Sequence, residues 1–255
     1  MTSEKIDHIV KWIKDYAQIG QHKFDTLVVG VSGGIDSSVV STLCAKTGLR
    51  TMPIVMSIRN KDILALEHAW WLEEKFENVS KRVVNLEKIF HEFEHASNYL
   101  GADSELAFAN SRSRLRMMML YQIAQSNKGL VVGTGNKCED FGVGFYTKYG
   151  DGGVDISPIA DCMKSEVYHM AEHLDISKKI QDAPPTDGLW EDGRTDEQQL
   201  GYSYEDLEKV MIADEQKSIV KNEHYISVME KFRTLRAKNK HKMAMPPVCS
   251  MEKFK

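Results

Sequence analysis

The residues best suited to chemistry lie in the segment 30–38, which reads GVSGGIDSS. Its adjacent glycines, Gly33 and Gly34, lack Cβ atoms, so backbone N–H groups can come close to an anion there. Serine hydroxyls on both sides add hydrogen-bond donors. Asp36 would repel a phosphate unless a cation lay between them. The segment therefore predicts a phosphate-binding loop that works with Mg²⁺.

A strand and a helix have to position this loop. Residues 26–31 form a continuous apolar, β-branched run, which predicts a strand buried on both faces. Residues 37–45 predict a helix whose positive N-terminal end points at the same anion. The P-loop pattern does not fit because its lysine is missing, and the glycine spacing excludes the dinucleotide fingerprint. The simpler alternative is a turn in which the glycines only permit tight backbone geometry.

The first half of the chain alternates between predicted strands and helices. Further strands are expected over 50–58, 82–86 and 129–133, and helices over 6–17 (with Ser3 as N-cap), 63–76 and 105–125. This alternation predicts an α/β fold, with a Rossmann-like open parallel sheet and helices on both faces. Ligands of such sheets bind at the carboxyl ends of the strands.

The second half of the chain is less regular. Residues 146–158 are rich in glycine and predict a loop, and 163–174 predict a helix. Residues 181–202 are acidic and contain two prolines, which predicts a long loop of the kind that often forms a lid. Ser203 is expected to cap a further helix. The basic stretch 231–242 fits an ordinary solvated helix face or a binding surface.

Composition restricts the class of protein. The chain has 255 residues with 42% hydrophobic and 27% charged residues, which suits a globular protein with a buried core. The longest apolar runs are far too short to span a bilayer, and the N-terminus lacks the apolar region of a signal peptide. Four scattered cysteines without a C-x-x-C pair predict neither zinc nor disulfides and fit a reducing cytoplasm. A net charge of −4 argues against a dedicated nucleic-acid binder.

The loop SGGIDSS resembles the pyrophosphate-binding loop of the N-type ATP pyrophosphatases. An ordered series of further segments is similar to the ammonia-dependent NAD synthetases, from about residue 6 to residue 241. These segments are 111–121 (SRSRLRMMMLY), 132–139 (VGTGNKCE), 145–155 (FYTKYGDGGVD), 158–164 (PIADCMK), 184–186 (PPT) and 241–242 (HK). The stretch TKYGDGGVD discriminates best between this family and its tRNA-modifying relatives.

The resemblance implies an adenine nucleotide α-hydrolase-like fold and one NAD synthetase domain over residues 1–255, without a glutaminase domain. It implies ATP-dependent amidation of deamido-NAD with ammonia, through an adenylate, to give NAD, AMP and pyrophosphate. It also implies a cytoplasmic homodimer without nucleic-acid or membrane partners. Two alternatives remain open: a tRNA-modifying adenylase, which would want a more basic surface, and a non-catalytic nucleotide-binding module.

The resemblance also assigns roles to matching residues. The ATP-binding residues would be Gly30, Val31, Ser32, Gly33, Gly34, Ile35, Asp36, Ser37, Thr134, Lys164 and Thr186. Those for deamido-NAD would be Arg114, Lys148, Asp155, His241 and Lys242. Asp36 and Glu139 would bind Mg²⁺, and Lys164 would neutralise phosphate charge in the transition state. Asp151 would collect ammonium and help to deprotonate it.

Each assignment has a simpler alternative. Glu139 could be a solvated acid and Lys164 a surface lysine. Of Arg112, Arg114 and Arg116, which fan out over one side of a helix, some are expected to be surface charges. The methionines 117–119 are expected to pack in the core. The chain also departs from the family, with one extra residue between positions 139 and 148 and GTGNKCE where many bacterial members have a GTDHAAE-like turn.

Overall fold

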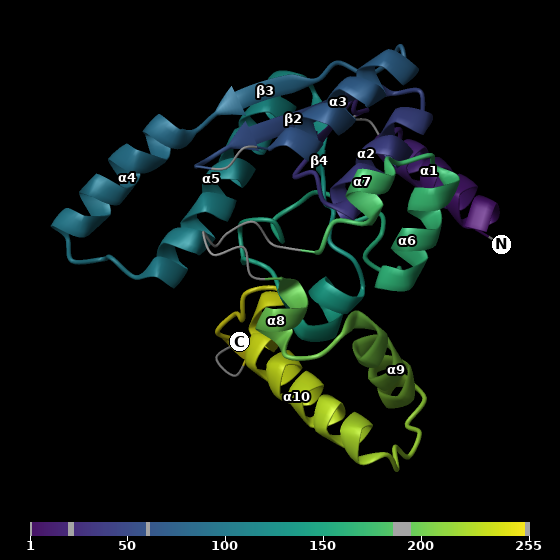
Figure 1. Cartoon of the computed structure of the whole chain (residues 1–255). Coiled ribbons are helices and arrows are strands. Elements are labelled where there is room, and N and C mark those ends of the chain that lie inside the picture. Colours follow the sequence, from purple (N-terminus) through teal and green to yellow (C-terminus); the bar gives the residue numbers. More distant parts are fainter. Residues whose placement is uncertain (1, 20–22, 60–61, 186–194, 253–255) are drawn as a thin grey trace.

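The computed structural model describes residues 2–19, 23–59, 62–185 and 195–252. Within them, the predicted strands form one parallel sheet in the order β3-β2-β1-β4 (Figure 1). The strands are β1 (Thr26–Gly30), β2 (Arg50–Ser57), β3 (Arg82–Asn85) and β4 (Gly129–Val132). An isolated parallel bridge joins Ile156 to Val132 and brings the glycine-rich loop to the edge of β4. The expected α/β fold is confirmed.

Helices cover both faces of the sheet because alternate strand residues point to opposite sides. Leu27 and Val29 of β1 pack into one apolar core, and Val28 packs into the other. The first core is covered by α1 (Thr2–Ala17), α2 (Ile35–Lys46), α6 (Lys164–His173) and α7 (Lys178–Gln181). The second is covered by α4 (Glu87–Tyr99) and α5 (Glu105–Ser126), while α3 (Ile63–Lys75) packs against β2.

The apolar stripe of the N-terminal helix is confirmed, since Ile6, Ile9, Ile13 and Ala17 are all buried. The predicted N-cap is wrong, because α1 already includes Thr2 and Ser3 lies inside the helix. Helix α4 was not expected from the sequence. It buries only Phe90 among its own residues.

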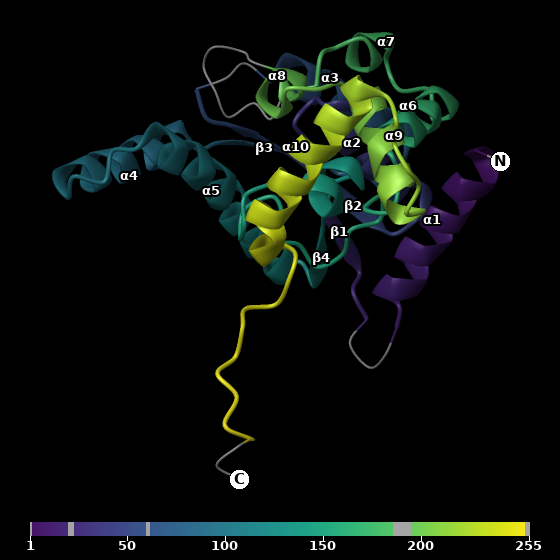
Figure 2. The same ribbon diagram turned by 90° about the horizontal axis from the view of Figure 1, so that it is seen from below.

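A second group of helices has an apolar core of its own. It consists of η1 (Cys138–Val143), α8 (Asp196–Leu200), α9 (Tyr204–Glu215), α10 (Glu223–Asn239) and η2 (Lys240–Lys242). We call this group the helical half and the remainder, with the sheet, the sheet half. The two halves meet where α9 contacts α6 and where η1 follows β4. Figure 2 shows the chain beyond α10 running away from both halves.

Two features of the helical half differ from the sequence expectations. The predicted loop 181–202 is interrupted by the short helix α8, which Thr195 caps with its side chain. A five-residue polar helix has too few apolar positions to show a helical period. The sequence also did not predict η1, a six-residue π-helix. π-Helical turns inside helices are typical of functional sites.

The cap predicted at Ser203 is confirmed, because its hydroxyl accepts a hydrogen bond from the Asp206 amide at the start of α9. Across the described parts of the chain, no helix is both long enough and apolar enough to cross a membrane.

Candidate active site

The loop between β1 and α2 is held by its own serine hydroxyls. The Ser32 amide donates to Ser37 Oγ at 3.2 Å, and the Gly34 amide donates to Ser32 Oγ at 3.2 Å. The hydroxyls of Ser37 and Ser38 donate to the Gly34 carbonyl at 3.0 and 2.9 Å. These bonds fix the loop, while the first amides of α2 have no acceptor within the helix and remain suited to an anion.

Gly33 is required for two reasons that the sequence did not show. Its φ angle is +84°, in the left-handed region where residues with a Cβ are strained. A Cβ at this position would also lie 2.7 Å from the Ala65 backbone nitrogen, at the start of α3. The missing side chain therefore lets the loop pack against α3, in addition to exposing amides.

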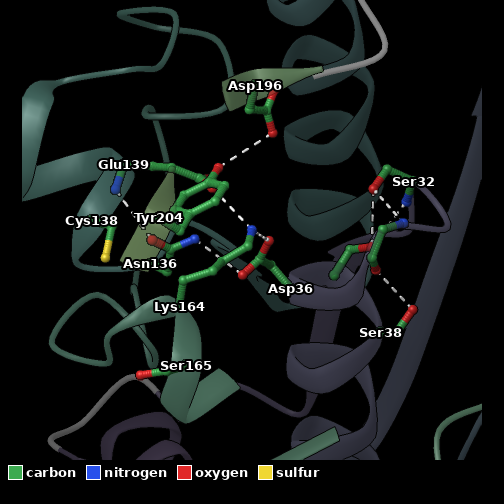
Figure 3. A network of polar contacts seen from close by, with 12 residues as sticks. Ser32, Asp36, Ser38, Asn136, Cys138, Glu139, Lys164, Ser165, Asp196 and Tyr204 are labelled. Carbon is green, nitrogen blue, oxygen red and sulfur yellow. Dashed lines mark hydrogen bonds and ion pairs between the residues drawn. The ribbon is translucent and has the colours of Figure 1, made fainter. Parts of the chain in front are cut away.

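Asp36 and Glu139 meet at one buried ammonium group (Figure 3). The Lys164 Nζ donates to Asp36 Oδ2 at 2.6 Å and to Glu139 Oε1 at 3.0 Å. Lys164 is only 2% exposed, which excludes the alternative of a surface lysine. The Glu139 side chain is 16% exposed, so it is not an ordinary solvated acid. Asp36, Glu139 and Lys164 thus form one ion cluster, although Asp36 and Lys164 are more than 100 positions apart in the sequence.

Lys164 and Glu139 keep their charges in the ion cluster, whereas burial holds the pKa of Asp36 above its ordinary value. Burial alone would lower the pKa of Lys164, but the two carboxylates outweigh burial and hold that pKa above its ordinary value. Burial alone would raise the pKa of Glu139, but the Lys164 charge and the hydrogen bonds from neighbouring groups hold it below its ordinary value. The ammonium and the Glu139 carboxylate are therefore both ionised at neutral pH.

Asn136 connects the two carboxylate-bearing segments. It is completely buried, and its Nδ2 donates to Asp36 Oδ1 at 3.1 Å. Its Oδ1 accepts a hydrogen bond from the Glu139 amide at 3.2 Å. One amide side chain in the turn after β4 therefore fixes Asp36 on α2 and the start of η1 together.

Tyr204 approaches the same cluster from the helical half (Figure 3). Its hydroxyl donates a short hydrogen bond to Glu139 Oε1 and lies 3.4 Å from Asp196 Oδ2. The Lys164 Nζ lies 4.8 Å from the centre of its ring, within the range of a cation–π contact. Burial and the Glu139 charge hold the pKa of Tyr204 above its ordinary value, so the hydroxyl remains a donor.

The donor set at this cluster fits Mg²⁺. Two carboxylates already converge on one cation, the Lys164 ammonium, beside the phosphate-binding loop. In the described residues no third acidic, histidine or cysteine side chain completes a cage for a metal ion. Mg²⁺ is commonly bound by one or two carboxylates together with substrate phosphates, so this incomplete set is the expected one.

Asp151 lies in the glycine-rich loop and is bound to α5. Its Oδ1 accepts hydrogen bonds from Ser113 Oγ at 2.6 Å and from the Thr147 amide at 3.0 Å. Its own amide donates to Ser113 Oγ at 2.9 Å. Burial raises the pKa of Asp151 above its ordinary value, and the charge of Glu139 contributes in the same direction. The structure thus places Asp151 in the electrostatic field of the carboxylate cluster without a direct contact.

Four residues predicted to hold deamido-NAD form a connected series. The Arg114 Nε donates to the Lys148 carbonyl at 3.2 Å, and the Lys148 Nζ donates to the His241 carbonyl at 3.0 Å. The Lys242 Nζ donates to two carbonyls of the segment before Lys148, at 2.9 and 2.8 Å. The C-terminal end of the helical half is thereby attached to α5 and the glycine-rich loop.

The fifth of these residues, Asp155, is engaged elsewhere. Its Oδ1 accepts from the Tyr121 hydroxyl at 3.1 Å, and its Oδ2 accepts from the Val131 amide at 2.8 Å. Both oxygens thus attach the loop to α5 and β4. Thr134 lies half-buried in the turn after β4, and Thr186 lies outside the described residues.

The three arginines on α5 differ in their solvent exposure, and not in the way that was expected. Arg114 is exposed, whereas Arg112 is 9% exposed and Arg116 donates from Nε to the Met56 carbonyl at 3.3 Å. The charges expected at the surface are therefore partly interior. The methionine expectation also holds only in part, because Met117 is buried but Met118 is 62% exposed.

Asn136 and Tyr204 are the contacting residues that sequence reasoning missed. Asn136 lies in the turn VGTGNKCE, and as an uncharged residue it gave no signal of a site role there, unlike Glu139. Tyr204 follows the predicted cap Ser203 and was indistinguishable from a core aromatic residue. Only the folded chain brings Tyr204 to a carboxylate 65 residues away.

Comparison with known proteins gives consistent results. Residues 5–246 match the sequence profile of the NAD synthase family. An NH(3)-dependent NAD(+) synthetase from Syntrophomonas wolfei is 34% identical over 251 residues, covering 95% of this chain and 94% of that protein. Two solved structures are similar over 98% of this chain.

The first of these structures is an NMN synthetase from Francisella tularensis, with a TM-score of 0.85, 29% identity and 99% of its chain covered. The second is an NH3-dependent NAD synthetase from Campylobacter jejuni, with a TM-score of 0.76, 25% identity and 100% of its chain covered.

Proposed function

The chain belongs to the NAD synthase family, and from this we propose that it is an ammonia-dependent NAD synthetase. The reaction converts deamido-NAD, ATP and ammonia into NAD, AMP and pyrophosphate. One structural observation carries the proposal beyond family membership. Asp36 and Glu139, from distant parts of the chain, converge on a single cation beside a loop built for phosphate.

The chemistry requires two steps. A nicotinate carboxylate resists attack by an amine because it has no leaving group. We propose that one carboxylate oxygen attacks the α-phosphorus of ATP, with release of pyrophosphate, to give a mixed anhydride with AMP. Ammonia then attacks the carbonyl carbon, loses a proton, and AMP departs with the shared oxygen. Water must be excluded until that second step is complete.

The residues of the ion cluster suit these steps. The loop around Gly33 and Gly34 would bind the phosphates of ATP. Asp36 and Glu139 would hold Mg²⁺, which neutralises phosphate charge when bound. Lys164, released from the carboxylates, would be free to pair with the phosphate oxygens. Asp151 would bind ammonium and accept its proton, since a fixed carboxylate both attracts the cation and takes up a proton.

We propose separate sites for the two nucleotides. A cavity of about 430 Å³ at the carboxyl ends of β2 and β3 is lined in part by Ser57, Arg59 and Asp62, just before the α3 residues that contact Gly33. We propose that it receives the nucleoside of ATP. Deamido-NAD would bind along the Arg114, Lys148, His241 and Lys242 series, where cations can pair with its diphosphate.

We further propose that the protein is cytoplasmic and that residues 1–255 act as one domain on free ammonia.

We also propose that the active form is a homodimer, and one surface supports this. An arm formed by α4 and the start of α5 projects from the sheet half (Figures 1 and 2). This arm exposes large apolar side chains, which are costly to leave in water. They are Ile89, Phe93, Tyr99, Leu100 and Leu106.

A second candidate function follows from the structural comparison. The NMN synthetase is the more similar of the two solved structures, by both TM-score and identity. By the same chemistry, this chain would amidate a nicotinate mononucleotide in place of the dinucleotide. Both substrates present the same carboxylate, so the choice depends on whether the adenylate half of deamido-NAD is bound.

The test is to supply deamido-NAD and nicotinate mononucleotide in separate reactions with ATP, Mg²⁺ and either ammonium or glutamine. Product and AMP are measured together. We expect a higher kcat/KM for deamido-NAD, with ammonium as the nitrogen source. A higher value for the mononucleotide would establish the second candidate. Cleavage of ATP to AMP without either amide would overturn both and favour a tRNA-modifying adenylase.

A further inference from the structure

The Glu139 carboxylate is held by neighbours from several parts of the chain. Its Oε1 accepts hydrogen bonds from both the Lys164 ammonium and the Tyr204 hydroxyl. The Asn136 side chain also interacts with this carboxylate and helps to hold its pKa low. Of these groups, only the Tyr204 hydroxyl reaches Glu139 from the helices α8 to α10.

Tyr204 is itself fixed from two directions. Its amide donates to Glu197 Oε1 at 2.9 Å, and its ring packs in the apolar core of the helical half. Asp196, whose carboxylate lies near the Tyr204 hydroxyl, donates its own amide to the Pro185 carbonyl at 3.0 Å. The hydroxyl thus lies between Glu139 and Asp196, the first residue of α8.

We propose that Tyr204 is a positioning residue for the metal site: its hydroxyl fixes the orientation of the Glu139 carboxylate, which would hold Mg²⁺, and it connects that carboxylate to helix α8. The proposal rests on the proposed function, because the metal site is part of it. Tyr204 touches neither substrate nor a reacting atom in this account. Groups that orient a metal ligand commonly alter metal affinity by about 10- to 100-fold when they are removed.

The chain offers a matched control. Tyr202 lies two residues earlier, is 7% exposed like Tyr204, and packs in the same apolar core. Its hydroxyl has no hydrogen-bond partner among the described residues. Tyr204→Phe and Tyr202→Phe therefore each remove one hydroxyl from a buried tyrosine of the same apolar core, and only the first removes a bond to Glu139.

The experiment measures Mn²⁺ binding without nucleotide, by electron paramagnetic resonance of the free ion, and the Mg²⁺ concentration that half-saturates NAD formation. For Tyr204→Phe we expect both constants to rise about tenfold, with the KM for deamido-NAD unchanged. For Tyr202→Phe we expect no change in either. Equal metal constants in the two variants would overturn the proposal.

A double variant distinguishes a specific effect on Glu139 from a general loss of folded protein. In a Glu139→Gln background, the added Tyr204→Phe change should leave the remaining Mn²⁺ affinity unaltered, because the group it orients is gone. The same loss in both backgrounds would show that Tyr204 acts independently of Glu139 and would overturn the proposal. A wild-type chain with no Mg²⁺ dependence and no product would overturn the proposed function as well, whereas normal wild-type turnover with unresponsive variants would overturn the Tyr204 role alone.

Discussion

The sheet half and the helical half each bring one carboxylate to the same ammonium, but they hold it differently. Asp36 begins a helix directly after a strand, in a loop whose serines fix one another. Glu139 lies on a π-helix and depends on Tyr204, which arrives from another helix. A local motif therefore suffices to place the first carboxylate, whereas the second requires the packing of a separate core.

The largest effect is expected at the junction of the two halves. Lys164→Met leaves two carboxylates close together without a buried cation, which costs about 3–5 kcal/mol when one partner of a buried pair is removed. We expect the free energy of unfolding in urea to fall by that amount and NAD formation to fall at least about 100-fold. Added Mg²⁺ should restore part of the stability, because it replaces the missing cation.

The control is Lys179→Met. Lys179 pairs with Glu67 at 3.0 Å, but the two side chains are 67% and 42% exposed. Exposed pairs contribute less than about 1 kcal/mol, so this variant should remain stable and active. Similar losses in both variants would show that the junction has no special role.

The separateness of the two cores can be tested with Leu207→Ala in the helical half and Leu43→Ala in the sheet half. Both leucines are fully buried, and each truncation should cost about 2–5 kcal/mol. Because the two halves have separate apolar cores, we expect Leu207→Ala to speed hydrogen exchange in α9 and α10 while β1 stays protected. Equal acceleration in β1 would show one inseparable core.

The phosphate-binding loop offers a smaller test within the sheet half. Gly33→Ala combines a strained φ with a Cβ contact of 2.7 Å to backbone, and should cost about 2–3 kcal/mol and weaken ATP binding. Gly48→Ala has a similar φ of +76° but meets no atom within 4 Å, so about 1 kcal/mol is expected. Thermal unfolding and ATP titration measure both. If Gly48→Ala were the more damaging change, packing against α3 would not explain Gly33.

The last prediction concerns the pH dependence of stability, which we expect a buried, neutral histidine to cause. His68 on α3 is 3% exposed and contacts Ser41 Oγ at 3.0 Å, and burial lowers its pKa to about 4. Below about pH 6.5 the unfolded chain binds a proton that the folded chain refuses, so stability falls as the pH drops from 6.5 towards 4. Between pH 7 and 5 this amounts to about 2 kcal/mol.

His68→Gln should remove that part of the pH dependence, and unfolding in urea at several pH values would measure it. His8→Gln, on an exposed position of α1, should leave the dependence unchanged. If the free energy of unfolding of His68→Gln changed with pH as it does in the wild type, groups other than His68 would cause the loss of stability in acid. The contrast between neutral His68 and the charged ion cluster would then not hold.

The sequence was sufficient for most of the sheet half. Continuous β-branched runs and the helical stripe of α1 follow from short-range periodicity, so β1, β2, β4 and their helices were expected within a few residues. The loop motif also identified Asp36. Helix α4 was not predicted, although its apolar residues do gather on one helical face; in the folded chain it buries a single residue of its own.

Much less of the helical half could be predicted from the sequence. Helix α8 is too short and polar to show a period, and no sequence pattern indicated the π-helix η1. Glu139 and Lys164 were identified by resemblance and not by local pattern. Asn136 and Tyr204 act through contacts across 100 and 65 positions, and no periodicity records such distances.

The central claim is that the substrate carboxylate is activated at the junction of the two halves by attack on the α-phosphate of ATP. It is tested most directly by labelling the carboxylate of deamido-NAD with ¹⁸O and locating the label after one turnover with ammonium. The account predicts one ¹⁸O in AMP and none in pyrophosphate. Label in inorganic phosphate, with ADP as the nucleotide product, would contradict it, because the carboxylate would then have attacked the terminal phosphate.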